Sequence, residues 1–127
     1  MTRLRVLILI YVALIIGVIV LVDQGDYQYL LRWVYLIPFG DKVGHFFLVG
    51  FLAALANLWW ECARWQLGKF VLLKGSVIVA TIMTLEEFSQ YFIKTRTFDL
   101  GDLSCDYMGI IVFGYVALWV CRKKEAF

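Results

Sequence analysis

Apolar residues in this chain run in long blocks instead of alternating with polar ones. Residues 6–22 form an uninterrupted apolar run of 17, preceded by Arg3 and Arg5. About 20 such residues, with a range of roughly 17–25, are needed to cross the hydrocarbon core of a bilayer. A signal peptide would need a small-residue cleavage site, which VLVDQGD does not offer. The run therefore predicts an uncleaved first transmembrane helix over about residues 5–22.

Three further apolar blocks follow, over about residues 43–60, 70–93 and 103–121. Inside a bilayer no water satisfies the backbone N–H and C=O groups, so helices are favoured over open strands. Short loops between helices make successive helices antiparallel. The pattern predicts an all-α integral membrane protein, a four-helix antiparallel transmembrane bundle in a single domain over residues 1–127.

Composition agrees with a membrane protein. The chain is 63% hydrophobic and 17% charged, whereas soluble domains average roughly 25% charged residues. The net charge is +2, and no basic run suggests nucleic-acid binding. The aromatic-rich segment 23–42 is expected to lie at the membrane interface. Three cysteines, Cys62, Cys105 and Cys121, show no CxxC spacing and fall in separate apolar segments, so we expect packed, reduced thiols and no disulfide framework.

Lysine and arginine counts near the helix ends predict the orientation, because these residues concentrate in cytoplasmic loops. Eight fall on one side, namely Arg3, Arg5, Arg64, Lys69, Lys74, Arg122, Lys123 and Lys124. Four fall on the other, namely Arg32, Lys42, Lys94 and Arg96. Both termini and the 61–69 loop are therefore expected in the cytoplasm. In a bacterial inner membrane, the 23–42 and 94–102 loops would then face the periplasm.

Polar residues gather at the outward level. The second helix begins at this level, the third ends there and the fourth begins there. Residues far apart in the sequence are therefore expected to lie close together in space. They are Asp41, Lys42, His45, Glu86, Glu87, Gln90, Arg96, Asp99, Asp102 and Asp106. Residues four apart share a helix face, which pairs 41 with 45, 86 with 90 and 102 with 106. Gly109 continues the last stripe and is expected to let a neighbouring helix come close. We expect one polar cluster.

The cluster offers acid/base chemistry and ligand contacts. A carboxylate facing lipid costs about 2.5–3.5 kcal/mol at mid-helix, so these groups should face inward. Catalytic candidates are His45 with Asp41 as its partner, and Glu87 or Asp102 as a second acid/base group. No serine or cysteine nucleophile lies beside His45 in sequence; Ser104 and Cys105 could approach it only through folding. The expected ligand-binding residues are Lys42, Gln90, Arg96, Asp99 and Asp106.

Structural explanations cover part of this cluster. Asp41 and Asp99 can cap helices, and Asp102 suits the positive end of a helix dipole. Capping does not explain Glu86, Glu87, Gln90 and Asp106, which lie within hydrophobic stretches. No cofactor is predicted. A divalent cation held by His45, Glu87, Asp102 and Asp106 remains an alternative, and these ligands suit magnesium, calcium or manganese better than zinc.

The same residues resemble the VanZ-like family of small bacterial membrane proteins, named for a member associated with teicoplanin resistance. Its pattern is Asp-Lys-x-x-His, then Glu-x-x-Gln, then Arg-x-Phe-Asp-x-x-Asp-x-x-x-Asn-x-x-Gly. This chain reads DKVGH at 41–45, EFSQ at 87–90 and RTFDLGDLSCDYMG at 96–109. Asp106 departs from the pattern, because an asparagine is usual at its position. The resemblance implies a cell-envelope protein linked to glycopeptide tolerance, without a defined reaction.

Three functions follow from these observations. The first is binding or modulation of a lipid, or of a lipid-linked envelope precursor, at the outward-facing cluster. The second is a membrane-embedded hydrolase or transferase that uses His45 and the carboxylates. The third, a transporter or proton relay, ranks last. The cytoplasmic halves of helices two to four offer only four polar residues, Asn57, Ser76, Thr81 and Thr84.

Overall fold

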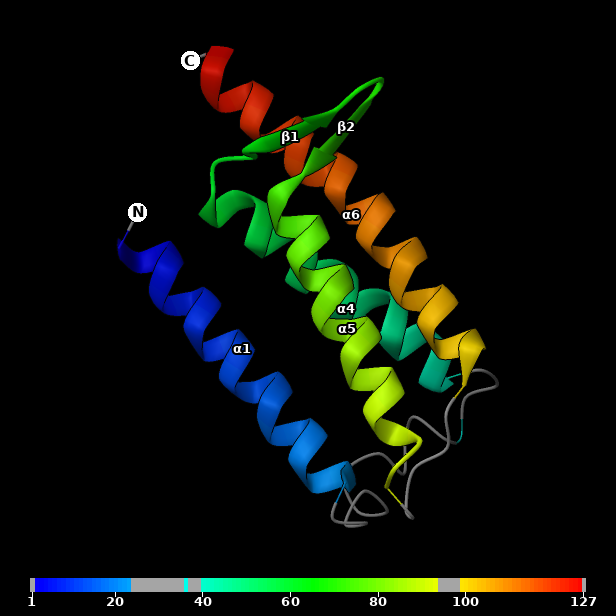
Figure 1. Cartoon of the computed structure of the whole chain (residues 1–127). Helices are drawn as coiled ribbons and strands as arrows, with labels where there is room; N and C mark the ends of the chain where they lie inside the picture. The colour runs from blue at the N-terminus through cyan, green and yellow to red at the C-terminus, as the bar shows by residue number, and fades with distance from the viewer. Residues whose placement is uncertain (1, 24–35, 37–39, 94–98, 127) are drawn as a thin grey trace.

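The computed structural model describes residues 2–23, 36, 40–93 and 99–126, and leaves the side chains of Val22, Asp23, Asp41 and Ala126 undescribed. The elements of this part are α1 (Thr2–Asp23), α4 (Gly40–Trp59), β1 (Arg64–Leu67), β2 (Phe70–Leu73), α5 (Lys74–Gln90) and α6 (Leu100–Ala126). Successive helices run in opposite directions, so both ends of the chain and the hairpin lie at one end of the molecule (Figure 1). The antiparallel order is thus as expected.

Three helices of the described part are long and apolar enough to cross a membrane: Thr2–Leu21, Lys42–Trp59 and Leu100–Glu125. The protein is accordingly a helical membrane protein. The first two agree with the expected helices over 5–22 and 43–60. The last begins three residues before the expected position 103 and continues past 121 to Ala126, because its basic end extends the helix beyond the apolar block.

The expected third helix over 70–93 is shorter in the structure. Helix α5 begins only at Lys74, because residues 70–73 form strand β2, which pairs antiparallel with β1. Leu67 lies opposite Phe70, which leaves Gly68 and Lys69 as a two-residue loop. The φ angle of Gly68 is +61°, a backbone conformation that favours glycine in tight hairpins. The apolar sequence FVLL is therefore a strand, and the helical prediction for it was wrong.

The core lies where α4, α5 and α6 meet, and small residues let their backbones approach closely. Its central cluster consists of Val49, Ala53, Val79, Met83 and Ile110. A Cβ atom added at Gly109 of α6 would overlap the carbonyl oxygen of Phe46 on α4. The expectation that Gly109 permits close helix packing is confirmed. Without hydrophobic contrast between helix and lipid, such close packing is a main source of helix association.

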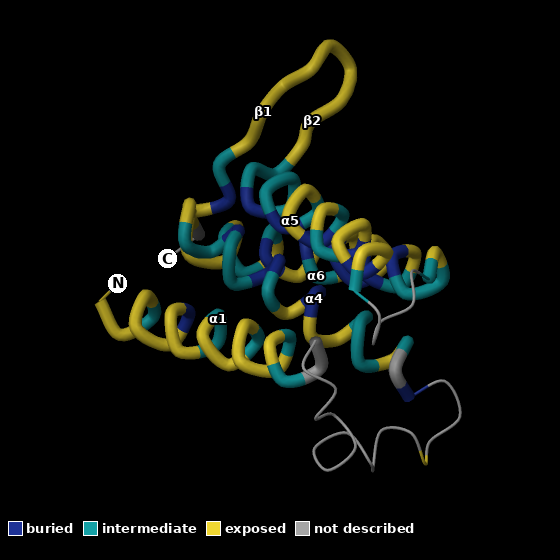
Figure 2. The backbone as a smooth tube through the Cα atoms, turned by 60° about the horizontal axis from the view of Figure 1, so that its bottom comes forward, coloured by how far each residue is buried: buried dark blue, intermediate teal, exposed yellow. Residues whose placement is uncertain are grey.

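Helix α1 lies apart from this core. It is exposed along most of its length (yellow in Figure 2). It contacts α4 through the Tyr11 hydroxyl, which donates to the Leu48 carbonyl at 2.9 Å, and through Arg5, which lies 5.3 Å from the ring centre of Trp59. An apolar helix that is exposed on most sides is suited to a lipid environment.

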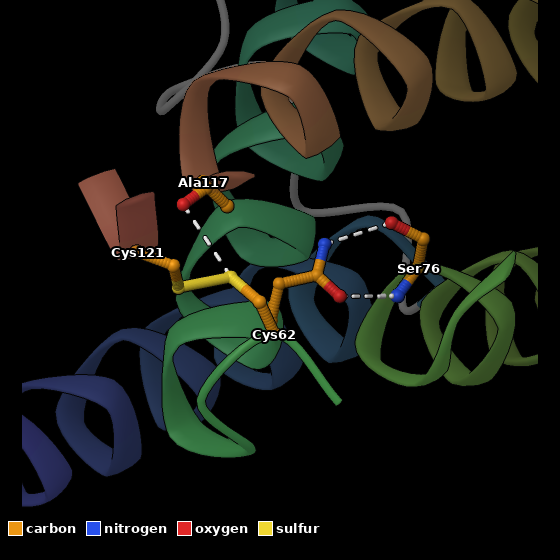
Figure 3. Close-up of a disulfide and its surroundings, with 5 residues drawn as sticks. Cys62, Ser76, Ala117 and Cys121 are labelled. Atoms are coloured by element: carbon orange, nitrogen blue, oxygen red, sulfur yellow. Dashed lines mark hydrogen bonds between the residues drawn. A yellow bond between two sulfur atoms is a disulfide. The ribbon is translucent and has the colours of Figure 1, made fainter. Parts of the chain in front are cut away.

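At the end that carries the termini and the hairpin, Cys62 and Cys121 form a disulfide (Figure 3). The expectation that all cysteines are reduced and packed was wrong for this pair, while Cys105 is free. The physical reason is the antiparallel order. It brings the turn after α4 and the last turns of α6 to the same end, so cysteines 59 residues apart meet.

Candidate functional site

The start of α4, the end of α5 and the start of α6 meet at the end of the molecule opposite the hairpin (Figure 1). Each brings polar side chains to this level. We call the set the charged cluster: Lys42, His45, Glu86, Glu87, Gln90, Asp99, Asp102 and Asp106. Hydrogen bonds and ion pairs join its members across the three helices, so the predicted convergence is confirmed for these residues.

Lys42 joins α4 to the first turn of α6. Its Nζ lies 3.0 Å from Oδ2 of Asp99 and 3.1 Å from Oδ1 of Asp102. Asp99 also caps α6, because its Oδ1 accepts a hydrogen bond from the backbone N–H of Gly101 at 2.7 Å. The bond from Lys42, followed by that from Gly101, lowers the pKa of Asp99 below its ordinary value. Asp99 is therefore a helix cap as well as a partner of Lys42.

His45 lies between two carboxylates of α6 that are one turn apart. Its Nδ1 lies 2.9 Å from Oδ1 of Asp106, and its Nε2 lies 3.7 Å from Oδ2 of Asp102. A protonated ring would present a donor to each carboxylate. The sequence suggested Asp41 as the partner of His45. That side chain lies outside the described part, and the partners that the structure gives His45 are Asp106 and Asp102.

Glu87 connects the end of α5 to the start of α6. It is fully buried. Its Oε1 accepts a hydrogen bond from the backbone N–H of Asp99 at 2.9 Å, and its Oε2 accepts one from Nε2 of Gln90 at 3.2 Å. The same Nε2 also lies 3.1 and 3.0 Å from the two carboxylate oxygens of Glu86. Buried polar groups require such partners, so Glu87 and Gln90 fix the chain around the cluster.

Asp106 is the deepest acid of the cluster on α6, one turn beyond Asp102. Its side chain is fully buried. Oδ1 faces His45, but Oδ2 has no hydrogen-bond partner among the described residues. A buried polar atom without a partner costs free energy and usually marks a strained or functional position. This position is also the one at which the chain departs from the VanZ-like pattern.

The predicted site residues are therefore largely brought together. Of the catalytic and ligand-binding candidates, Lys42, His45, Glu87, Gln90, Asp99, Asp102 and Asp106 belong to the charged cluster. Arg96 and the side chain of Asp41 lie outside the described residues. Within the part of the chain that the structure describes, no group of three or more His, Cys, Asp or Glu side chains is arranged to hold a metal ion.

An open groove lies between α5 and α6 next to the cluster. It has a volume of about 270 Å³ and is lined by Ala80, Thr81, Thr84, Leu85 and Tyr107. Its threonine hydroxyls donate to backbone carbonyls of their own helix at 2.8 and 2.7 Å, and Thr84 is hydrogen-bonded to Tyr107. The polar atoms are thus satisfied, and the groove presents a mainly apolar lining. Thr84 is one turn from Glu87, and Tyr107 adjoins Asp106.

Sequence reasoning overlooked the role of Asn57, at the opposite end of α4. Asn57 is fully buried. Its Oδ1 accepts a hydrogen bond from the backbone N–H of Ser76 at 3.0 Å, and its Nδ2 donates to Oγ of Ser76 at 2.8 Å. It satisfies the first turn of α5, where the N-cap residue Leu73 provides no side-chain hydrogen bond. An asparagine within an apolar block, followed after one loop by a serine, was the available signal.

Comparison of the chain with protein-family models, with curated proteins and with solved structures gives no match. The resemblance to VanZ-like proteins is not tested by these comparisons. The geometry of the charged cluster and the groove therefore provides the basis for a function.

Proposed function

We propose that the chain is a multi-pass protein of the bacterial inner membrane whose charged cluster holds the polar head group of a lipid or of a lipid-linked envelope precursor. The observation that carries this proposal is the convergence of three helix ends on buried polar side chains. Glu87, Gln90 and Asp106 are 0–2% exposed, although membrane helices tolerate such groups only at a cost in free energy. Ionisable residues retained at that cost are functional candidates by default.

In this proposal α5 is the fourth membrane span. Its 17 residues extend about 26 Å at about 1.5 Å per residue, slightly less than the roughly 30 Å of the hydrocarbon core. The excess of lysine and arginine at the hairpin end favours a cytoplasmic location for both termini. The charged cluster then lies at the level of the outer head groups.

The charges of the cluster suit a ligand that carries groups of both signs. Lys42 already lies between Asp99 and Asp102, and carboxylates outnumber lysine among the described residues of the cluster. The excess acid favours an ammonium or hydroxyl group of the ligand. Arg96, outside the described residues, is the residue we assign to a phosphate or carboxylate of the same head group, because guanidinium binds such groups in a bidentate manner.

The groove between α5 and α6 favours an amphiphilic ligand. Its lining is mainly apolar, and it includes Thr84, one turn from Glu87 on α5, and Tyr107, which follows Asp106 in the sequence of α6. A hydrocarbon chain in the groove would leave its head group at the charged cluster. A mainly apolar surface with a few nearby polar groups that fix the orientation is typical of ligand-binding sites.

We include in the proposal that the chain belongs to the VanZ-like family, because it contains the motifs DKVGH, EFSQ and RTFDLGDLSCDYMG. With that membership comes an expected link to teicoplanin tolerance. Asp106, in place of the usual asparagine, adds a carboxylate at the deepest position of the site. We therefore expect the head group that binds here to carry a positive or hydrogen-donating group near that depth.

Lipid retention tests the proposal. The full chain, purified in mild detergent, is analysed by native mass spectrometry for bound lipid. The Arg96→Ala variant is compared with Lys69→Ala, which removes a cation from the hairpin at the opposite end. We expect the wild type and Lys69→Ala to retain the same lipid and Arg96→Ala to lose most of it, together with any teicoplanin tolerance. Equal retention and equal tolerance in all three proteins would refute the proposal.

The position of His45 between two carboxylates favours a second candidate, a membrane-embedded hydrolase or transferase. Such a histidine can act as a general base. Ser104 is a poor nucleophile in this structure, because its hydroxyl donates to the Leu100 carbonyl at 2.8 Å. A divalent cation would belong to this alternative, and elemental analysis of chelator-free protein tests it. Turnover of a lipid that His45→Gln abolishes would support the enzyme, whereas full complementation by His45→Gln would exclude it.

A further inference from the structure

The disulfide between Cys62 and Cys121 closes the end of the bundle that carries most basic residues. It joins the turn after α4 to the last turns of α6 across 59 residues of chain, as Figure 3 shows. The hairpin and α5 lie between the two cysteines. When the bond is closed, the turn after α4 is therefore tied to α6 at the end of the bundle where α5 begins.

The charge pattern and the disulfide point to different compartments. Lysine and arginine are in excess at this end, which favours the cytoplasm. Cytoplasmic thiols are kept reduced, and disulfides found there are mostly transient ones with catalytic or sensing roles. A permanent structural disulfide would require the opposite orientation of the chain. The two observations agree if the bond opens and closes.

The site accommodates a reduced cysteine as well as a disulfide. Cys62 is 4% exposed, and its sulfur lies 3.4 Å from the carbonyl oxygen of Ala117, the contact dashed in Figure 3. A thiol at this position would donate a hydrogen bond to that carbonyl. Opening of the bond therefore leaves the buried sulfur of Cys62 with a hydrogen-bond partner, while the two sulfurs move apart from bonding to van der Waals distance.

The backbone around Cys62 provides independent support for a specific role. Among the described residues, Glu61 and Cys62 have φ angles of 53° and 56°, which residues other than glycine rarely adopt. The turn is held by a 2.7 Å hydrogen bond from the Cys62 N–H to the Asn57 carbonyl. Glycine would occupy it without strain. This strained turn brings the Cys62 sulfur to within 3.4 Å of the Ala117 carbonyl oxygen of α6.

We propose that Cys62 and Cys121 form a reversible redox latch at the cytoplasmic end of the bundle. The thiolate is the form that takes part in thiol–disulfide exchange, and Cys121, the less buried of the two cysteines, is the one that an exchange partner reaches first. On oxidation the two thiols lose two electrons and two protons to a disulfide-bearing partner, which becomes a dithiol. A dithiol reductant reverses the exchange with the same balance. This proposal rests on the orientation proposed above and does not depend on the identity of the ligand.

Thiol trapping in intact cells tests reversibility. Cells that express the full chain with Cys105→Ser are quenched with acid, and free thiols are counted by the gel shift that a polyethylene-glycol maleimide produces. We expect two labelled thiols in untreated cells, none after treatment with diamide, and two again after dithiothreitol. A pair that stays unlabelled in untreated cells, or stays fully labelled after diamide, would overturn the latch.

Orientation is measured separately, so that failure of the latch is distinguished from failure of the lipid proposal. Gln66→Cys, on the exposed strand β1, is placed in a chain without the native cysteines and exposed to a membrane-impermeant maleimide. Labelling only after the membrane is permeabilised agrees with the latch. Labelling of intact cells overturns it, while lipid retention by the wild type is unaffected by this result.

A stability measurement tests the mechanical effect. We expect the unfolding temperature of the purified oxidised protein to fall by at least about 5 °C on reduction. Cys62→Ser should abolish this redox difference, and Cys105→Ser, the matched control, should retain it. An equal unfolding temperature in both redox states of the wild type would contradict the assignment.

Discussion

Replacing His45 by leucine should destabilise the protein, because it leaves the buried carboxylate of Asp106 without a hydrogen-bond donor. Nδ1 of His45 lies 2.9 Å from Oδ1 of Asp106, whose side chain is fully buried. The other oxygen of Asp106 has no partner among the described residues. Leucine fills much of the space of the imidazole ring, so the main loss is the interaction and not the packing.

The magnitude follows from the burial of the pair. Removing one partner of a buried ion pair costs about 3–5 kcal/mol. The side chain of His45 is 24% exposed, so we expect the lower end, about 3 kcal/mol. The double variant His45→Leu/Asp106→Leu removes both polar groups, and such apolar replacements are often neutral. It should unfold within about 1 kcal/mol of the wild type. Asp106→Asn keeps an acceptor for His45 and should cost less than His45→Leu, about 1–2 kcal/mol.

The assay is reversible unfolding of the full chain in bicelles by increasing sodium dodecyl sulfate, followed by circular dichroism. The decisive comparison is between His45→Leu and the double variant, because the second substitution is expected to restore about 2 kcal/mol. A double variant that loses as much free energy of unfolding as His45→Leu, or more, would refute the pairing. So would a His45→Leu variant as stable as the wild type.

Three more perturbations test other parts of the structure. Asn57→Ala should lower the free energy of unfolding by about 2–3 kcal/mol, because two buried hydrogen bonds to the first turn of α5 are lost; a loss below about 0.5 kcal/mol would contradict this. Gly109→Ala should cost about 1–3 kcal/mol through overlap with α4. Gly17→Ala, which meets nothing within 4 Å, should not destabilise, and equal effects would argue against the close contact. The pKa of Asp99 is lowered in the folded protein. Its pair with Lys42 therefore stabilises the fold fully at pH values above the ordinary carboxyl pKa of about 4. This stabilisation is lost as the pH falls through the lowered pKa. Since Asp99 is 44% exposed, the contribution is below about 1 kcal/mol. Lys42→Met should raise the carboxyl midpoint seen by NMR, and an unchanged midpoint would disprove the pairing.

Much of the fold could be predicted because each membrane span appears in the sequence as a block of apolar residues. These blocks predicted α1, α4 and α6 to within a few residues. The antiparallel order of the helices explains why polar groups 60 positions apart in the sequence meet, as Lys42 and Asp102 do. The hairpin was missed because FVLL adjoins an apolar helix and was counted with it. The Gly68-Lys69 pair directly before the apolar stretch FVLL was the signal for a two-residue turn.

The depth in the bundle at which the polar side chains lie could be predicted from the sequence. Which of these side chains contact one another was less predictable. Helical spacing placed Asp102 and Asp106 on one face, but it could not show that His45 faces both of them. The disulfide was missed because sequence spacing carries no information on which cysteines meet once the chain has crossed the membrane several times. Asn57 was noted as a polar residue, yet its bonds to Ser76 depend on the turn between α4 and the hairpin.

Recognition of a head group by the charged cluster is the central claim, and lipid-dependent stabilisation measures it directly. The lipid that remains bound to the purified protein is added back to delipidated protein, beside a diacylglycerol with the same chains and no head group. We predict that the complete lipid raises the unfolding temperature in proportion to the logarithm of its concentration, as expected for a ligand of the folded state. The diacylglycerol should raise it far less, and the Arg96→Ala variant should lose the difference. Equal stabilisation of the wild type by both lipids would show that the cluster does not recognise a head group.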